Sequence, residues 1–435
     1  MTERRGATMD DRRKLGWGLA ALLVAGNVIG SGVYLLPVAL APFGSSSLIG
    51  WVLVGLGALA LAGVFAGLGR FHPGADGLSG YVEKGLGRFT GYVAIIAYWL
   101  ANVAGIVGIA VAAVGYLAVF FPVLKQTWPG AWCNVALIWL MTVLAMFGPR
   151  VMAQLGGAAL MIGLAPIVAA IGVGLFAFEP GVFAASWNPG GQPLSASLPP
   201  SLVLIFWAFI GVECAGVISQ RVRDPARDVG RASLAGIGLA AVVYVAATVA
   251  VFGVIPAAEL AESTSPFADL AGRLVGPAAV AVIAACAVIK ASGSVGGWIT
   301  VNAETARSAA RKGYLPRVFG DGLQTPRRNL VIHGVLMTLI ALASAQPTLG
   351  GQFAILATVT TVLILVVYLL CCAALIRLTS SLRWRMAALV GMIMPAWAAA
   401  TTEPRLLLVA AGLVVLIGLG WLLVRRPVDP ESAPL

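Results

Sequence analysis

The chain has 435 residues, of which 60% are hydrophobic and only 10% are charged. Soluble domains average about 45–50% apolar and about 25% charged residues, so the composition excludes an ordinary soluble globular protein. At about 20 residues for each membrane-spanning helix, the chain has room for about twelve spans with short connections and for no further soluble domain. The five cysteines are odd in number and lie in apolar stretches, and there are only two histidines. We therefore expect no disulfide framework, no metal site and no cofactor.

The predicted spans begin with an apolar stretch from Leu15 to about Ala41. A basic segment precedes it, as in a signal peptide, but no small-residue cleavage site follows, so we expect an uncleaved first span. Further apolar stretches occur at about 48–69, 89–120, 131–148, 154–178, 200–219, 230–256, 276–303, 330–347, 350–376, 386–401 and 405–424. The sequence therefore predicts an all-α polytopic membrane protein with about twelve transmembrane helices.

The basic residues predict the orientation, because cytoplasmic connections carry an excess of lysine and arginine. Of the 28 lysines and arginines, 24 fall on the side of the N-terminus, and Lys125, Arg273 and Arg405 fall on the other side. An even number of spans puts both termini on one side, so we expect both in the cytoplasm of a bacterial-type cell, with the chain in its inner membrane. The net charge of +11 then reflects membrane topology and predicts no nucleic-acid partner.

Two predicted spans are interrupted by glycine and polar residues. These are GNVIGSG at 26–32 in span 1 and WAFIGVE at 207–213 in span 6. In hydrocarbon an interrupted helix must line a cavity or be buried in protein, because its backbone groups find no water. Spans 1 and 6 correspond if spans 1–5 and 6–10 are inverted halves, and such a pair indicates the substrate site of a transporter. The alternative for Gly26 and Gly30 is close helix packing through small residues.

The two breaks offer complementary backbone groups. In span 1 the outer half-helix begins at the break and presents the N–H groups of Ser31 and Gly32, which attract a carboxylate. In span 6 the outer half-helix ends at the break with carbonyls around Trp207 and Ile210, and the carbonyl of Val28 lies across from them. These carbonyls attract an ammonium group. A pocket with donors for a carboxylate and acceptors for an ammonium fits an α-amino acid.

Three side chains near the breaks are candidate pathway residues. Glu213 is the only carboxylate well inside a predicted span, and such a residue usually marks a pathway or a proton relay. Its alternative role is that of a neutral glutamate hydrogen-bonded for packing. Trp207 and Trp298 could each be an ordinary core or lipid-facing aromatic. Gly296 and Gly297 would give the indole of Trp298 the backbone clearance to face a cavity and stack on a cation.

The segments GNVIGSGVYLLP (26–37), WAFIGVE (207–213), GSVGGW (293–298) and Tyr368-Leu369-Leu370 resemble the amino acid-polyamine-organocation (APC) superfamily. Within it they resemble the basic amino acid/polyamine antiporters, and the arginine:agmatine branch in particular. This resemblance implies the leucine-transporter fold, a 5+5 inverted repeat with two accessory helices. The chain would then divide into tails at 1–14 and 425–435, repeats at 15–178 and 200–377, and accessory spans 11 and 12 at 383–424. A homodimer through spans 11 and 12 is a further expectation.

The same resemblance implies roles for individual residues. The substrate carboxylate would bind at Ser31 and Gly32, and its ammonium at the carbonyls of Val28, Trp207 and Ile210. Trp207 resembles an outer gate and Trp298 a middle gate, while Thr360 stands near the distal end of the substrate. The residues that resemble an inner gate are Tyr98, Glu213 and Tyr368.

Two positions depart from the arginine exchangers. Where they have an asparagine on span 3, this chain has Ile106, with Asn102 one helical turn earlier, so the distal group would be recognised differently. Lys290 stands where they have a small residue, on one helical stripe with Ser294 and Trp298. Lys290 either snorkels to the periplasmic interface or faces the outer vestibule. In the vestibule it would be a neutral amine that binds a proton or a cation that favours neutral or acidic cargo.

The sequence predicts a secondary-active transporter and no enzyme. We expect exchange of an amino acid for a related amine, of arginine:agmatine type, by alternating access. The alternative is proton-coupled uptake of a neutral or other amino acid. The spans have too few polar residues to line a channel, and one midplane carboxylate is too little for a membrane enzyme. A further alternative is a membrane sensor that binds amino acids without transporting them. It would differ from the transporters only in showing no counterflow in liposomes.

Overall fold

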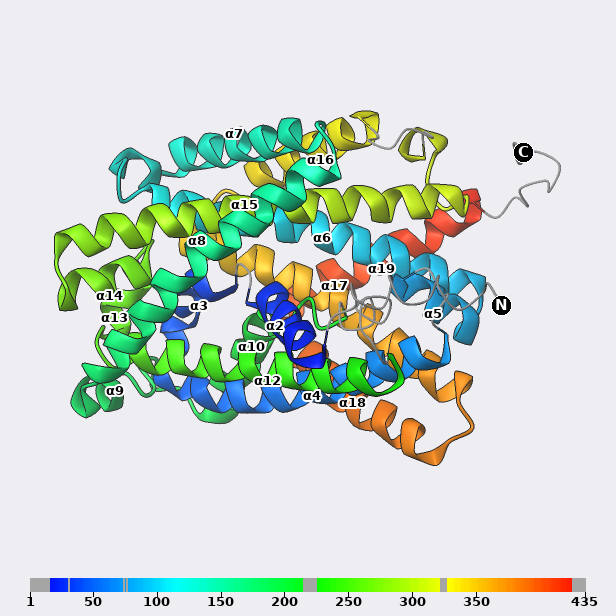
Figure 1. Cartoon of the computed structure of the whole chain (residues 1–435), viewed down its shortest axis with the longest axis horizontal. Helices are drawn as coiled ribbons and strands as arrows, with labels where there is room; N and C mark the ends of the chain where they lie inside the picture. Colours follow the sequence, from blue (N-terminus) through cyan, green and yellow to red (C-terminus); the bar gives the residue numbers. More distant parts are fainter. Residues whose placement is uncertain are drawn as a thin grey trace, which may run out of the picture.

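The computed structural model describes residues 16–29, 32–72, 75, 77–213, 225–320 and 327–424. These residues form helices joined by turns and contain no strand, which confirms the predicted all-α class (Figure 1). The helices are α2 (Trp17–Val28), α3 (Gly32–Leu40), η2 (Ala41–Ser46), α4 (Ser47–Phe71), α5 (Gly77–Leu86), α6 (Arg88–Leu117), η3 (Pro122–Lys125), α7 (Thr127–Ala145), α8 (Pro149–Phe176), α9 (Pro180–Ala185), α10 (Leu194–Trp207), α12 (Pro225–Phe252), α13 (Ala257–Glu262), α14 (Pro266–Leu274), α15 (Pro277–Arg311), η5 (Arg317–Phe319), α16 (Arg327–Ala343), α17 (Leu349–Leu378), α18 (Leu382–Ala400) and α19 (Pro404–Val424).

The long helices account for the predicted spans. Within the described residues, eight helical stretches are long and apolar enough to cross a membrane, and one of these joins α3 to α4. The other predicted spans correspond to α2, α10, α16 and α18, which are shorter or less apolar. Because α2 and α10 stop at the predicted interruptions, each is too short to cross a bilayer by itself.

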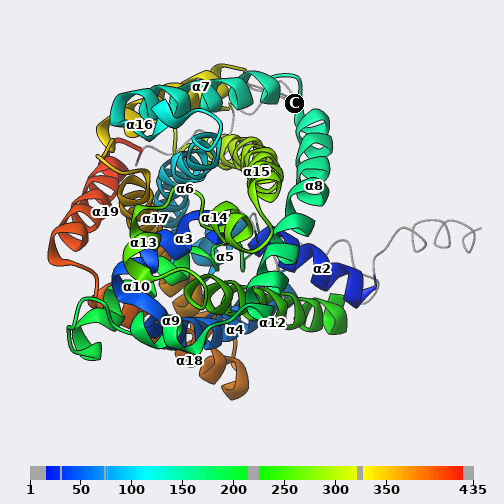
Figure 2. The same cartoon turned by 90° about the vertical axis from the view of Figure 1, so that its left-hand side faces the viewer.

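The bundle places small residues in its centre and large apolar residues on its outside. Figure 2, which looks along the bundle, shows α6, α3 and α17 near the middle and α7, α16, α8, α18 and α19 around them. The central helix α6 is rich in alanine and glycine and is buried over most of its length. Leucines on α19 are exposed instead, Leu408 by 72% and Leu423 by 87%. An apolar outer surface of this kind is stable in lipid and not in water.

Short helices that the sequence did not predict cap both ends of the bundle. At the end on the right of Figure 1, α5 carries Glu83, which accepts hydrogen bonds from Lys312 Nζ at 3.2 Å and from the Tyr314 hydroxyl at 3.1 Å. Burial and the neighbouring carboxylate raise the pKa of Tyr314 to about 12. At the opposite end lie α9, α13 and α14, where burial raises the pKa of Asp269 despite its hydrogen bond from Ser263.

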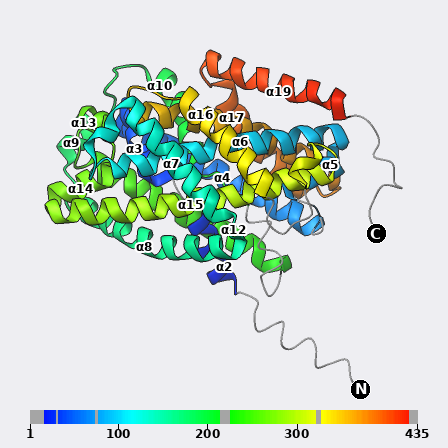
Figure 3. The same cartoon turned by 90° about the horizontal axis from the view of Figure 1, so that it is seen from above.

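Helices α8 and α15 run antiparallel and in close contact, side by side in Figure 3. A methyl group added at Gly296 would lie 2.1 Å from Met152 Cε, and one added at Gly293 would lie 2.4 Å from the Ala159 methyl. One added at Gly163 would lie 2.2 Å from the Cβ of Lys290. Glycine therefore lets the two backbones approach at three successive levels, as small residues do between membrane helices.

Candidate functional site

The first predicted break separates α2 from α3. Helix α2 ends at Val28 and α3 begins at Gly32, which confirms the interruption expected at 26–32. Gly32 therefore lies at the start of a helix, where backbone N–H groups have no partner within the helix. Ser31, the other predicted carboxylate ligand, lies outside the described residues. The start of α3 is thus a suitable site for an anion.

The second predicted break follows α10. The helix ends at Trp207, and the chain continues to Glu213 in tight turns. The carbonyl of Trp207 accepts the N–H of Ile210 at 3.2 Å, so it is part of a turn and not the free acceptor that we expected. Gly211 has a φ of 109°, which favours glycine because it has no Cβ. Ile210 is partly buried within this turn.

One side chain links the two breaks. The hydroxyl of Tyr244 on α12 lies 2.6 Å from the carbonyl oxygen of Val28 and 2.9 Å from that of Ala208. Its single proton is shared between these acceptors, so the carbonyl of Val28 already has a partner but keeps a second lone pair. The Tyr244 ring stacks on Trp51 at a centroid distance of 5.0 Å and meets Phe209 edge-on at 5.6 Å. Tyr244 therefore holds the end of α2 against the turn after α10.

Helices α6, α10 and α17 meet at a group of polar atoms without partners. A methyl group added at Gly105 on α6 would lie 3.4 Å from the Trp207 ring and 3.2 Å from Thr360 Cγ2. Asn102 lies one turn from Gly105 on the same face of α6. The indole nitrogen of Trp207, the amide nitrogen of Asn102 and the hydroxyl of Thr360 are buried, and none has a hydrogen-bond partner among the described residues. Since buried polar groups normally have partners, this cluster marks a place for a ligand or water.

A second layer surrounds Glu213. Its Oε1 accepts the hydroxyl of Tyr98 at 2.9 Å, and its Oε2 accepts the hydroxyl of Tyr368 at 2.5 Å and the N–H of Gly211 at 2.9 Å. The structure thus brings together the three residues that resemble an inner gate. These three hydrogen bonds tie α6, the turn after α10 and α17 together through Glu213.

The two layers lie at different levels along the bundle axis, and we call the region between them the compartment. Tyr98 and Gly105 are seven residues apart on α6, and Thr360 and Tyr368 are eight residues apart on α17. At a rise of about 1.5 Å per residue, both helices place the Trp207 layer about 10–12 Å from the Glu213 layer. Asn102 lies between them. This length suits an extended amino acid or diamine with a charged group at each end.

The remaining predicted residues lie outside this compartment or at its wall. Ile106 is buried, with 1% of its side chain exposed. Trp298 is partly buried and has no hydrogen-bond or aromatic partner among the described residues. Gly296 packs against Met152 of α8, so this glycine serves the contact between helices. Around Gly297, by contrast, no described residue of another helix lies within 4 Å of an added methyl group.

Lys290 is buried at the contact between α15 and α8. Only 6% of it is exposed, and its Nζ donates a hydrogen bond to Ser294 Oγ at 2.9 Å. Ser294 lies toward the middle of α15, whereas the nearer end of the helix is at Pro277, so the expectation that Lys290 snorkels to that end is wrong. Its stem lies against Gly163, so the side chain faces α8 and no open vestibule.

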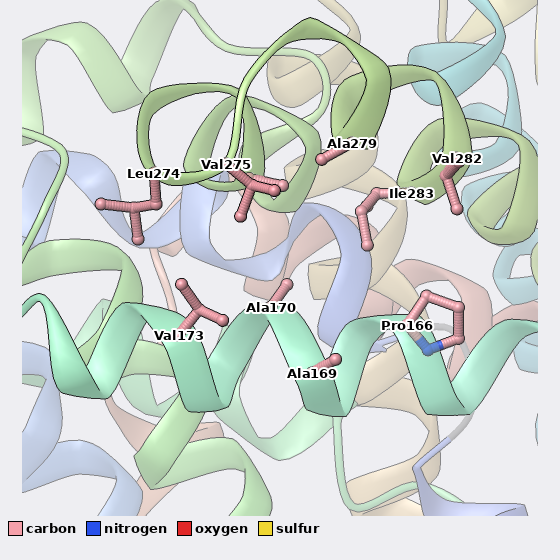
Figure 4. Close-up of a pocket in the computed structure, with 10 residues that line it drawn as sticks. Pro166, Ala169, Ala170, Val173, Leu274, Val275, Ala279, Val282 and Ile283 are labelled. Atoms are coloured by element: carbon pink, nitrogen blue, oxygen red, sulfur yellow. The ribbon is translucent and has the colours of Figure 1, made fainter.

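A separate cavity is purely apolar. It has a volume of about 230 Å³ and lies between α8, α14 and α15 (Figure 4). Pro166 and Val173 line it from α8, Leu274 from α14 and Ile283 from α15. A charged amine gains no hydrogen bonds there and would lose its hydration. This cavity is therefore unsuitable for a charged amine.

Two features of the site were missed in the sequence. Tyr244 looks like one more aromatic residue of an apolar span, and only the requirement that a buried hydroxyl find a partner hints at its role. Gly105 and Gly108 look like ordinary small residues of a packed helix, yet both lie against the Trp207 ring. Phe353 of α17 completes that contact, with its ring edge-on to Trp207 at 5.8 Å.

Comparisons with known proteins match nearly the whole chain. The sequence model of a family described as amino acid permease matches residues 15–428. The chain is 33% identical over 379 residues to the cadaverine/lysine antiporter of Escherichia coli (strain K12), an alignment covering 85% of this chain and 84% of the relative. It is 30% identical over 365 residues to the putrescine transporter PotE of the same strain, covering 83% of each. PotE of Haemophilus influenzae is 31% identical over 364 residues, covering 83% of this chain and 84% of the relative. The expected resemblance to basic amino acid/polyamine antiporters is confirmed.

Proposed function

Because the chain belongs to the amino acid permease family and is a multi-pass amino acid or polyamine transporter, we propose that it exchanges an amino acid for a related amine by alternating access. The all-α bundle agrees with the leucine-transporter fold of this family. The observation that carries the proposal is the pair of interrupted helices, whose ends at Val28 and Ala208 share the hydroxyl of Tyr244. Interrupted helices supply backbone donors and acceptors at the middle of the membrane, where a polar cargo needs them.

The compartment gives each part of the cargo a partner. The carboxylate binds the N–H groups at the start of α3, at Gly32 and Ser31. The ammonium group binds carbonyls at the breaks, at Val28 and Ile210, with Trp207 beside it. The distal group reaches Asn102 and Thr360, whose polar atoms have no other partner among the described residues. The residues that gate the compartment are Trp207 and Trp298 on one side and Tyr98, Glu213 and Tyr368 on the other.

We favour lysine and cadaverine, or ornithine-sized relatives such as putrescine, over arginine and agmatine as cargo. A guanidinium group has five N–H donors in a fixed plane and needs several acceptors. Ile106 offers none where the arginine exchangers have an asparagine. The hydroxyl of Thr360, which has no partner among the described residues, can accept from a compact ammonium group. The names of the relatives that match this chain, a cadaverine/lysine antiporter and putrescine transporters, support the same choice.

The orientation, repeats and assembly belong to the same proposal. The distribution of basic residues supports cytoplasmic termini in the bacterial inner membrane. The repeats occupy 15–178 and 200–377, so that α2 and α10 correspond. Accessory spans 383–424 contain α18 and α19, and a homodimer through these helices is part of the proposal.

The second candidate is proton-coupled uptake, which the buried Lys290 favours because an ionisable side chain inside a span is usually functional. The remaining alternative is a sensor that binds cargo without moving it. Counterflow at equal pH separates a transporter from a sensor, and uptake driven by a pH gradient into vesicles without internal cargo shows proton coupling.

The test is uptake into proteoliposomes that contain the purified full chain. Vesicles are preloaded with lysine, cadaverine, putrescine, arginine, agmatine, alanine or buffer, and uptake of radiolabelled lysine is followed at several pH values. We expect lysine, cadaverine or putrescine inside the vesicles to accelerate uptake at least tenfold over buffer, and arginine or agmatine to do less. A matched control is Lys84→Met, a change of an exposed residue on α5. Equal uptake with every preload, buffer included, would refute exchange.

A further inference from the structure

Lys290 is a buried cation without a counter-ion. Among the described residues its one hydrogen-bond partner is the hydroxyl of Ser294, and no carboxylate lies within 4 Å of its Nζ. An ammonium group removed from water and left with a single hydroxyl is strongly unfavourable, because neither solvent nor an opposite charge compensates it. A neutral amine is suited to the same place, since it can both donate to and accept from a serine hydroxyl.

The helix that faces Lys290 offers no charge either. Helix α8 contacts its stem at Gly163, and the only titratable side chain on α8 is Arg150, thirteen residues away and so about 20 Å along the helix. Helix α2 touches the same part of α8, where a methyl group added at Gly26 would lie 3.4 Å from Leu160. No residue of α2 is titratable.

The other helices that pack against α15 keep their titratable groups occupied or distant. On α6, Tyr98 is bonded to Glu213 and Tyr116 to the carbonyl of Tyr34. On α14, Asp269 accepts a hydrogen bond from Ser263 and Arg273 is paired with Glu259. Helices α7 and α16 meet α15 nearer its other end, at Gly296 and Ala303. The nearest titratable group on α15 itself is the thiol of Cys286, one turn away.

We propose that Lys290 is a proton-binding site of the transport cycle, which holds no proton while α8 and α15 are packed together and takes one when they part. Water that enters between the helices donates the proton to the amine nitrogen, giving an ammonium group. The cargo-free protein carries this proton across the membrane. When cargo binds on the other side, the proton returns to water there, the helices close and the neutral amine rebinds Ser294. This role depends on the proposed function, since a coupled proton has meaning only in a transporter.

The position of Lys290 gives the coupling a direction. Leu160 and Gly163 are neighbours on one face of α8, so the α2 end of the first break and Lys290 lie on either side of the same turn of α8. A cationic cargo bound at the break repels an ammonium group there and favours the neutral amine. Binding of one cation and release of one proton are therefore linked, so a cationic amino acid moves one way as a proton moves the other.

The test uses lysine, whose single net positive charge makes exchange for one proton electroneutral. Proteoliposomes are prepared with the lumen one pH unit more acidic than the bath, and accumulation of radiolabelled lysine is compared with counterflow at equal pH. With one proton per lysine, this gradient drives up to about a tenfold accumulation, because one pH unit is equivalent to a factor of ten. Lys290→Met should keep the counterflow and lose the accumulation, and Lys84→Met should keep both.

The outcomes separate the two proposals. Counterflow without gradient-driven accumulation in the parent, or accumulation that persists in Lys290→Met, would overturn the role of Lys290 and leave the exchanger standing. Absence of counterflow and of accumulation in the parent would overturn both. If Lys290→Met does not fold, Ser294→Ala decides, because removing the hydroxyl should move the midpoint of the pH–uptake curve by half a unit or more. An unmoved midpoint in a folded Ser294→Ala would also refute the role.

Discussion

The hydroxyl of Tyr244 connects the two helix breaks, and Tyr244→Phe removes it alone. The phenylalanine ring keeps the stacking on Trp51 and the edge contact with Phe209. The carbonyls of Val28 and Ala208 lose their shared donor. The variant therefore tests whether this link positions the acceptors for the cargo.

The size of the effect follows from burial, because only 1% of Tyr244 is exposed. Leaving a buried acceptor without its donor costs about 1–3 kcal/mol. If that cost falls on cargo binding, the dissociation constant rises by a factor of about 5 to 150. Loss of one hydroxyl should not exceed this range, since its one proton makes one hydrogen bond at a time.

The assay is binding of lysine and cadaverine to the purified protein by titration calorimetry, together with the melting temperature. Tyr116→Phe is the matched control, because it removes a buried hydroxyl bonded to the carbonyl of Tyr34 and touches neither Val28 nor Ala208. We expect weaker binding in Tyr244→Phe and similar losses of thermal stability in both variants. Equal affinities of the parent and Tyr244→Phe would refute the link between the breaks.

Three further outcomes follow from the same structure. Gly32→Val should abolish binding of lysine in a radioligand assay, because the valine side chain blocks approach to the start of α3. Ser31→Ala should weaken binding less. Equal binding by Gly32→Val and the parent would show that the carboxylate site lies elsewhere. Glu213→Gln should keep binding and slow exchange, because the amide nitrogen cannot accept a hydroxyl proton from Tyr98 or Tyr368, and an unchanged exchange rate would make Glu213 a packing residue. Burial raises the pKa of Asp269 above its value in the unfolded chain, so the folded protein binds the extra proton and is stabilised as the pH falls through that range. Melting temperatures of the parent should therefore rise relative to those of Asp269→Asn between pH 7 and about pH 4, and parallel curves would contradict this.

Most of the fold could be predicted from the sequence because hydrocarbon imposes a simple rule. A span must be apolar and helical over about 20 residues, so continuous apolar stretches mark the helices directly. The short helices α5, α9, α13 and α14 could not be predicted in this way. They lie in the connections, where turns and helices have similar composition and tertiary contacts such as those of Glu83 decide between them.

The site was predictable where backbone chemistry alone defines it. Glycines next to polar residues indicated the interruptions after Val28 and Trp207. The partners of those interruptions were not predictable, because Tyr244 comes from a helix 216 residues further along the chain than Val28. The orientation of Lys290 likewise depends on Gly163 of another helix.

The three levels of contact between α8 and α15 limit how these helices can move. At each level a glycine faces a side chain or methyl group with no space to spare, from Met152 to Lys290. A slide of one residue along the axis would bring side chains against backbone at every level at once. Packed interfaces of this kind have discrete arrangements and do not deform continuously. The two helices are therefore either packed together or separated. A step that requires their separation then occurs once in each transport cycle and is not gradual.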